Sequence, residues 1–281
     1  MKSLTLGAAL LLGTGVAFAQ QNQSNLTQDG NKNTADVEQV GATNISLLIQ
    51  NDNRNTSAVN QTGAANVSEI QLTGGKSSMN LTQLGDRNSS AALITEANNR
   101  VSVLQEGNDN AARQEIDAPS SEASIFAEGD NNLTVQMISG VGNNVASISI
   151  SGSNNTATQE VNGENSRSYV VTSGDNSLAV TTQNGTSNNI NLIQELGDNN
   201  SAVVAQNGDN NFAGGEDDPQ LTQMGSDNSL VLSQDGDMNA STIMQRGNAN
   251  EALNAQSGNE NASVITQLGN HNAASVVQRA Q

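Results

Sequence analysis

The side chains that recur at fixed spacing in this sequence, and so could share one chemical task, are amides. The motif Gln-x-Gly-x-x-Asn occurs twelve times. An amide donates and accepts hydrogen bonds but is no general acid, general base or nucleophile, so hydrogen bonding between motif copies is the chemistry that the pattern supports. The glutamines are Gln28, Gln39, Gln61, Gln83, Gln105, Gln183, Gln206, Gln223, Gln234, Gln245, Gln256 and Gln267. Asparagines assigned with them are Asn33, Asn44, Asn66, Asn88, Asn110, Asn228, Asn239, Asn250, Asn261 and Asn272. The glycines, which we assign to turns, are Gly30, Gly41, Gly63, Gly85, Gly107, Gly185, Gly208, Gly225, Gly236, Gly247, Gly258 and Gly269.

Groups suited to catalysis or metal binding are scarce. Cysteine is absent and His271 is the single histidine, so a histidine-dependent triad or a thiolate site finds too few members. We therefore expect no enzyme activity, no cofactor and no metal site. A calcium site at Glu216, Asp217 and Asp218 is the sharper alternative, but the ligand spacing of an EF-hand is missing. Carboxylates in turns could also bind cations collectively, although a solvated acidic edge is our interpretation; examples are Asp86, Asp109, Asp130, Asp175 and Asp198.

The composition excludes other classes of protein. The chain holds three Phe, one Tyr and no Trp, so an aromatic core is not expected, and Phe126 and Tyr169 are interpreted as isolated packing residues. A net charge of −18 argues against a nucleic-acid partner, because phosphate binding needs clustered Lys and Arg.

The spacing of the motif defines the elements that must position the amides. Marker positions advance in steps of 11, and one Gly per unit argues against a helix because each Gly costs about 1 kcal/mol there. Within a unit, Leu230, Leu232 and Gln234 fall on one side, and Val231 falls on the other. This alternation predicts a strand, and the Gly-containing cluster predicts a turn.

Two units make a strand-turn-strand rung of about 22 residues. The sequence thus predicts an all-β fold, a parallel, in-register β-solenoid of about eleven rungs. Its inward face would carry files of Gln, Asn, small residues and aliphatic residues. Stacked identical amides about 4.8 Å apart can hydrogen-bond as a ladder, which fixes the register. The pairing of the degenerate rungs between Ile116 and Thr172, and the handedness of the stack, are left open.

Five segments follow from these patterns. Residues 1–19 read as a signal peptide, since one Lys precedes an apolar run that ends in Ala-Phe-Ala. A short N-terminal segment spans 20–27, repeats span 28–211, an interrupting loop spans 212–220, and repeats resume over 221–281. One-residue slips are expected near Gly140-Val141-Gly142 and Glu195.

The repeat resembles the curlin repeat, in which Gln-x-Gly-x-x-Asn is followed by Ala or Ser two residues later, as in residues 28–35 and 267–274. The resemblance covers almost all of the chain after the signal peptide. It implies a subunit of curli, bacterial surface fibres of cross-β architecture that serve adhesion and biofilm matrix, with a nucleator subunit and an outer-membrane secretion channel as partners. The chain departs from familiar curlins in having room for about eleven repeats rather than about five. The family's Gly-rich segment is reduced to residues 20–25, and the family's aromatic residues are largely aliphatic.

Two functions remain open. Repeats begin soon after the expected cleavage point and run to the last residues, with no visible terminal cap, so open strand edges are expected to recruit further strands and propagate a homopolymer. The favoured function is a secreted, extracellular fibre subunit. The alternative is a monomeric or surface-attached β-solenoid adhesin or ligand-binding module. Whether the chain is a major subunit or a nucleator, and which surface it adheres to, stay undecided.

Overall fold

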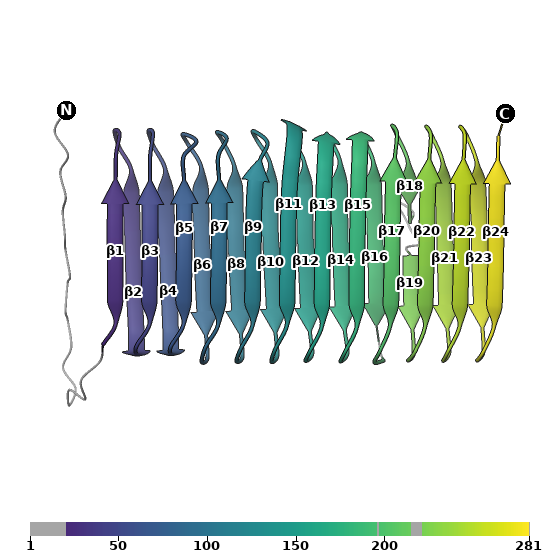
Figure 1. The fold of residues 1–281 in the computed structure, drawn as a ribbon, viewed down its shortest axis with the longest axis horizontal. Helices are drawn as coiled ribbons and strands as arrows, with labels where there is room; N and C mark the ends of the chain where they lie inside the picture. The colour runs from purple at the N-terminus through teal and green to yellow at the C-terminus, as the bar shows by residue number, and fades with distance from the viewer. Residues whose placement is uncertain (1–20, 196, 215–220, 281) are drawn as a thin grey trace.

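The computed structural model describes residues 21–195, 197–214 and 221–280. Over these residues the protein is all-β and forms a β-solenoid of about 11 turns spaced about 22 residues apart, as predicted. Figure 1 shows the strands stacked side by side from the N-terminal end to the C-terminal end, in two layers. No described helix could span a membrane.

The first layer, sheet A, holds twelve parallel strands in sequence order. Its strands are β1 (Gln23–Gln28), β3 (Ile45–Gln50), β5 (Val67–Leu72), β7 (Ser89–Ile94), β9 (Ala111–Asp117), β11 (Leu133–Gly142), β13 (Thr156–Glu164), β15 (Leu178–Thr186), β17 (Ser201–Asn207), β20 (Ser229–Asp235), β22 (Glu251–Ser257) and β24 (Ala273–Arg279).

The second layer, sheet B, lies behind it, and its strands run in the opposite direction in Figure 1. Its strands are β2 (Thr34–Ala42), β4 (Thr56–Ala64), β6 (Ser78–Leu84), β8 (Arg100–Glu106), β10 (Glu122–Glu128), β12 (Val145–Ser151), β14 (Arg167–Ser173), β16 (Asn189–Glu195), β18 (Phe212–Ala213), β19 (Leu221–Met224), β21 (Ala240–Arg246) and β23 (Ala262–Leu268). The short strands β18 and β19 both pair with β16 and β21, so they share one level of the stack.

Side chains alternate between the inward and the outward face along each strand, as predicted. In β20, Leu230, Leu232 and Gln234 are buried, whereas Val231 between them is 39% exposed.

Parallel pairing keeps equivalent inward positions in register from strand to strand, so Gln206, Gln234 and Gln256 stand over one another. The order Asn, small residue, aliphatic residue and Gln is kept in β17, whereas β20 carries Leu230 at the small position and β22 carries Asn254 at the aliphatic position.

Each turn that carries a motif glycine contains two residues with positive φ. The first is the motif glycine, as at Gly85, where φ is 111°. A Cβ added there would lie 2.1 Å from the carbonyl oxygen of Gly107, so both the conformation and the close stacking of turns require glycine. The second is the residue two positions later, such as Arg87, with φ 57°.

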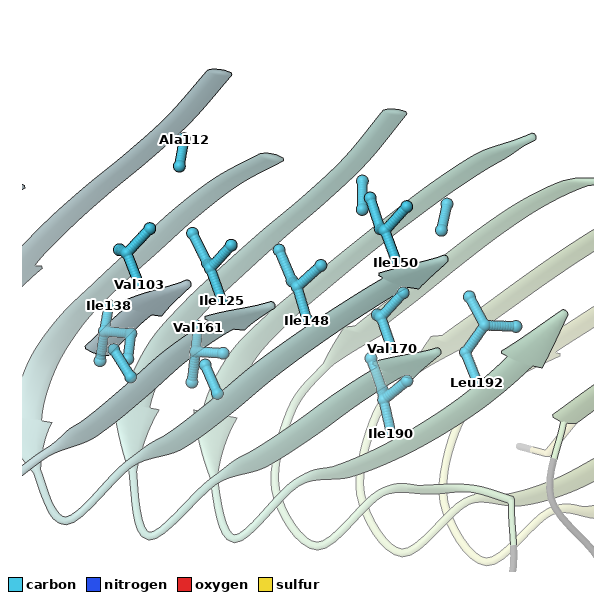
Figure 2. Close-up of a cluster of buried hydrophobic side chains, with 14 of the residues drawn as sticks. Val103, Ala112, Ile125, Ile138, Ile148, Ile150, Val161, Val170, Ile190 and Leu192 are labelled. Carbon is cyan, nitrogen blue, oxygen red and sulfur yellow. The ribbon is translucent and has the colours of Figure 1, made fainter. Parts of the chain in front are cut away.

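Aliphatic files fill the core between the sheets. In Figure 2, Val103, Ile125, Ile148, Val170 and Leu192 follow one another along sheet B. Each is at most 2% exposed, and burial of such a side chain contributes about 1.5–3 kcal/mol. The degenerate middle rungs are thus continuous with the rest of the stack.

The ends of two predicted segments shift. Residues 23–28, expected partly in an N-terminal segment, form β1, because Ser24, Leu26 and Gln28 alternate like every other unit and pair with β3. Phe212 and Ala213, expected in the interrupting loop, form β18 and continue the register of Asn189 and Ile190.

The insertion therefore enters at one outward position. Ala213 pairs with Ile190 and Leu221 pairs with Leu192, so seven residues of the sequence separate Ala213 from Leu221, where Asn191 alone separates their partners in β16. The slip at Gly140–Gly142 is present as a bulge against β13. Paired residues of β14 and β16 are 22 positions apart in the sequence, whereas those of β15 and β17 are 23 apart. One extra residue therefore lies between β16 and β17, as expected from the slip near Glu195.

Phe126 and Tyr169, interpreted from the sequence as isolated packing residues, lie in strands β10 and β14 but outside the core. Both point outward, and Tyr169 is 38% exposed, because they occupy the outward phase of their strands. The predicted signal peptide and the proposed calcium ligands Glu216, Asp217 and Asp218 lie outside the described residues.

Candidate functional site

The motif glutamines form hydrogen-bonded ladders along the stack. Gln83, which is fully buried, donates from Nε2 to Oε1 of Gln105 at 2.9 Å and accepts at its own Oε1 from Gln61 at 2.8 Å. The same Nε2 also donates across the core to the carbonyl oxygen of Val67 at 3.1 Å. Each interior amide is therefore bonded above, below and across to the other sheet.

These ladders have a direction. The amide nitrogen must face the cross-core carbonyl, which only accepts, so the side chain cannot be flipped. As a result every ladder donates toward the C-terminal end of the stack and accepts from the N-terminal end. Two ladders that begin inside the core start with an unpaired acceptor, since the buried Oε1 atoms of Gln114 and Gln183 have no donor. In a third, Oε1 of Gln194 accepts from the Oγ1 hydroxyl of Thr172 at 3.1 Å.

Four runs of glutamines follow this scheme. In sheet B one run joins Gln39, Gln61, Gln83 and Gln105, and a second joins Gln194, Gln223, Gln245 and Gln267. Between these two runs the same position holds Ala127, Ile150 and Thr172. In sheet A, Gln28 bonds Gln50, and a later run joins Gln183, Gln206, Gln234, Gln256 and Gln278. All twelve predicted glutamines belong to one of them.

Sequence reasoning missed a fifth run. Gln114, Gln136 and Gln159 in sheet A bond one another at 2.8 and 2.9 Å, two residues earlier in their strands than the motif position. The motif position there holds Ile116, Ile138 and Val161. Exchange of glutamine and aliphatic residue between two neighbouring inward positions is the signal that could have revealed it.

The predicted asparagines mostly do another task. Asn66 donates from Nδ2 to the carbonyl oxygen of Gly85 in the next turn at 2.7 Å, and its Oδ1 accepts from the backbone N–H of Asn88 at 2.9 Å. Asparagine thus ties each turn to the next rather than forming a side-chain ladder, because it lies at the corner where backbone groups are free. Only toward the C-terminal end do side-chain amides bond each other, as Asn250 does with Asn228 at 3.1 Å.

The glycines lie where they were assigned. All twelve have positive φ, between 92° and 122°. The second positive-φ position was not foreseen, because it carries unrelated residues such as Lys32, Thr43, Ala65 and His271.

The two ends of the described stack present the ladders with no further strand over them. Strands β1 and β2 each pair on one side only, and so do β23 and β24. Leu26, Val37 and Val276 are only partly buried against the core for this reason. Among described residues, the Oε1 atoms of Gln28 and Gln39 accept from no ladder neighbour.

Ionisable groups remain on the outside. Arg87 bonds Asp109 in the next turn of its row through Nη2 at 2.6 Å, and this hydrogen bond, followed by its charge, lowers the pKa of the Asp109 carboxyl. Within the part of the chain that the structure describes, no three His, Cys, Asp or Glu side chains gather as metal ligands would.

No protein-family model matches the chain, and no curated protein gives a significant match.

Proposed function

We propose that the protein is the structural subunit of an extracellular, curli-like amyloid fibre that grows by end-to-end addition of copies and serves surface adhesion and biofilm matrix. The observation that carries the proposal is the set of directional glutamine ladders, which are present at both ends of the described stack. Backbone groups and amides at such an edge are satisfied when another in-register strand is added.

The charge pattern supports an exported polymer. Net charge of −18 keeps single copies apart in dilute solution, while the inward faces of the end strands carry no ionisable side chain to oppose stacking. The resemblance to the curlin repeat supports export by a curli-type outer-membrane channel and growth from a nucleator subunit, with location on the bacterial surface.

Purified chain from Gln20 onward, diluted out of denaturant, tests the proposal. Growing, self-seeding filaments with reflections at about 4.7 Å and about 10 Å are expected from the strand and sheet spacings. A stable, soluble, β-rich monomer that never seeds would overturn it.

A ligand-binding or adhesin module is the second candidate, favoured by one surface. A shallow groove on the outer face of sheet B is lined by the hydroxyls of Ser102, Ser124 and Ser147 beside the ring of Phe126. Rows of hydroxyls beside an aromatic ring suit a polyhydroxylated ligand such as a glycan. Glycan-array binding by soluble monomer, lost in Phe126→Ser, would favour this candidate.

A further inference from the structure

The number of strand levels that the described residues form is odd. Sheet A has twelve levels, and sheet B has eleven because β18 and β19 share one, which gives 23 levels in all. The last strand of sheet B is β23, and the last of sheet A is β24. A solenoid that continued beyond β24 would next place a strand on β23 and then one on β24.

The first two strands fit these two places when a second copy supplies them. With β1 of the added copy on β23, and β2 on β24, every inward residue meets one of its own kind in the register of the stack. The inward pairs are Asn22 on Asn261, Ser24 on Ser263, Leu26 on Ile265 and Gln28 on Gln267 at β23, and Asn33 on Asn272, Ala35 on Ala274, Val37 on Val276 and Gln39 on Gln278 at β24.

The free hydrogen-bonding groups are complementary at this joint. Nε2 of Gln267 bonds only the carbonyl oxygen of Glu251 among described residues, so one of its N–H groups is free to continue the ladder. Oε1 of Gln28 on the added copy is the acceptor that the ladder requires. Gln278 and Gln39 repeat this relation on the other sheet, since Nε2 of Gln278 bonds only the carbonyl oxygen of Ala262 within the described part of the chain.

The outward faces fit as well. Val264 and Val277, on the last strand of sheet B and of sheet A, are 71% and 58% exposed, against 39% for Val231 inside the stack, so they gain cover from an added strand. In the joint they face Asn25 and Glu38, and no outward pair brings two like charges together.

Simple translation of a second copy does not produce this joint. It places β1 on β24 within sheet A, but β2 then lies two strand spacings, about 9.6 Å, from β23. A gap one strand wide opens in sheet B at each junction and leaves Ile265 and Gln267 uncovered.

We infer that successive copies join end to end with a half-turn about the fibre axis, so that β1 and β2 of one copy continue β23 and β24 of the previous copy and sheets A and B exchange sides at each junction. This inference rests on the proposed function and adds the geometry of the joint. Each copy advances the fibre by 11.5 spacings of about 4.8 Å, or about 55 Å, and the structure repeats after two copies, about 110 Å.

Helical reconstruction of fibres grown from the chain tests the joint. We expect a rise of about 55 Å per copy together with a rotation of half a turn. Because the chain has no cysteine, Asn80→Cys carrying gold on the outer face of sheet B would mark alternate sides of the fibre. Fibres without rotation between copies, with marks on one side, would overturn the joint while leaving the fibre function intact, whereas absence of fibres would overturn the function itself.

Removal of one 11-residue unit should change the relation between successive copies from a half-turn to a translation. Deletion of residues 251–261 removes one level, makes the number of levels even, and keeps the end strands β1, β2, β23 and β24 unchanged. The half-turn between successive copies should then disappear, so that copies are related by translation alone. A half-turn that persisted in fibres of the deletion variant would contradict the inference.

A single substitution addresses the contact itself. At Gly269, a Cβ would meet only Nδ2 of Asn272 at 3.6 Å, whereas at Gly247 it would lie 2.1 Å from the carbonyl oxygen of Gly269. In the half-turn joint, the carbonyl oxygen of Gly30 on the added copy takes the corresponding place over Gly269. Because Gly269 has φ 103°, we expect Gly269→Ala to lower the exchange protection of the monomer only locally, in its own terminal turn, and to slow elongation at least tenfold. Gly247→Ala, which adds a clash inside the stack, should also lower the exchange protection of the neighbouring rung. Normal elongation of Gly269→Ala would count against the joint, since translation alone leaves that glycine facing a gap.

Discussion

Replacement of a ladder glutamine by leucine should cost more inside a ladder than at its end. Gln83 and Gln105 are adjacent members of one ladder in sheet B, both fully buried, and each donates to one cross-core carbonyl, at 3.1 and 3.0 Å. Leucine is of similar size, so lost packing and lost cross-core bonding are nearly the same at both sites.

The two variants differ in the amide groups left without partners. Gln83→Leu leaves the Nε2 of Gln61 without its acceptor and the Oε1 of Gln105 without its donor. Gln105→Leu leaves only the Nε2 of Gln83 without its acceptor, because the next inward residue is Ala127. Each buried unsatisfied group costs about 1–3 kcal/mol, so Gln83→Leu should be less stable than Gln105→Leu by about that amount.

Native-state hydrogen exchange on dilute, unpolymerised chain measures this difference, because a solenoid opens locally and a global unfolding midpoint would average over rungs. The opening free energy of peptides that cover β6 and β8 should fall further in Gln83→Leu. Equal losses in the two variants, or a larger loss in Gln105→Leu, would refute the account of the ladder as a chain of mutually satisfied amides.

Three further outcomes are expected. Gln245→Ala should slow assembly more than Met244→Ala, because Gln245 is buried with three hydrogen bonds while Met244 points outward. Seeded thioflavin kinetics measure this difference, and equal rates for the two variants would show that the ladder has no part in assembly. Replacement of residues 214–220 by a single Asn should join β18 and β19 into one strand and leave the unfolding midpoint unchanged or higher, since a shorter connection loses less entropy; a marked loss of stability would show that the insertion supports the fold. Arg87 lowers the pKa of Asp109, so stabilisation by this pair is present at neutral pH and is lost as pH falls through that lowered pKa. The opening free energies that native-state hydrogen exchange gives for peptides spanning Arg87 and Asp109 should therefore differ between wild type and Asp109→Asn at neutral pH and converge in acid. A difference that persisted in acid would contradict this.

Some of the inward glutamines could be predicted from the residue pattern within one strand, and others could not. Gln245 could be assigned inward because the alternation Asn239, Ser241, Ile243 and Gln245 holds within one strand and recurs from unit to unit. Gln136 could not, because its strand carries Ile138 at the motif position, and only the pairing of neighbouring strands shows that Gln114, Gln136 and Gln159 stand over one another.

In the turns, likewise, one of the two positive-φ positions can be predicted from the sequence and the other cannot. Glycine in the motif signals positive φ, since other residues rarely adopt it at low cost. Its companion position, occupied by residues as different as Lys32, Met238 and His271, carries no such signal. The stacked turns impose the conformation there, through backbone bonds such as that from the N–H of Met238 to the carbonyl oxygen of Asp209 at 2.9 Å.

Sequence alone determined the strands, the turn glycines, the inward face and the parallel stack, because a period of 2 within a period of 11 is a local property that few folds accommodate. Tertiary structure alone decided the direction of the ladders, the role of asparagine in tying turns together, the extra ladder from Gln114 to Gln159 and the odd number of levels. These features depend on which groups meet across and along the core, and a hydrogen bond between residues one full solenoid turn apart exists only once the chain has wound back over itself.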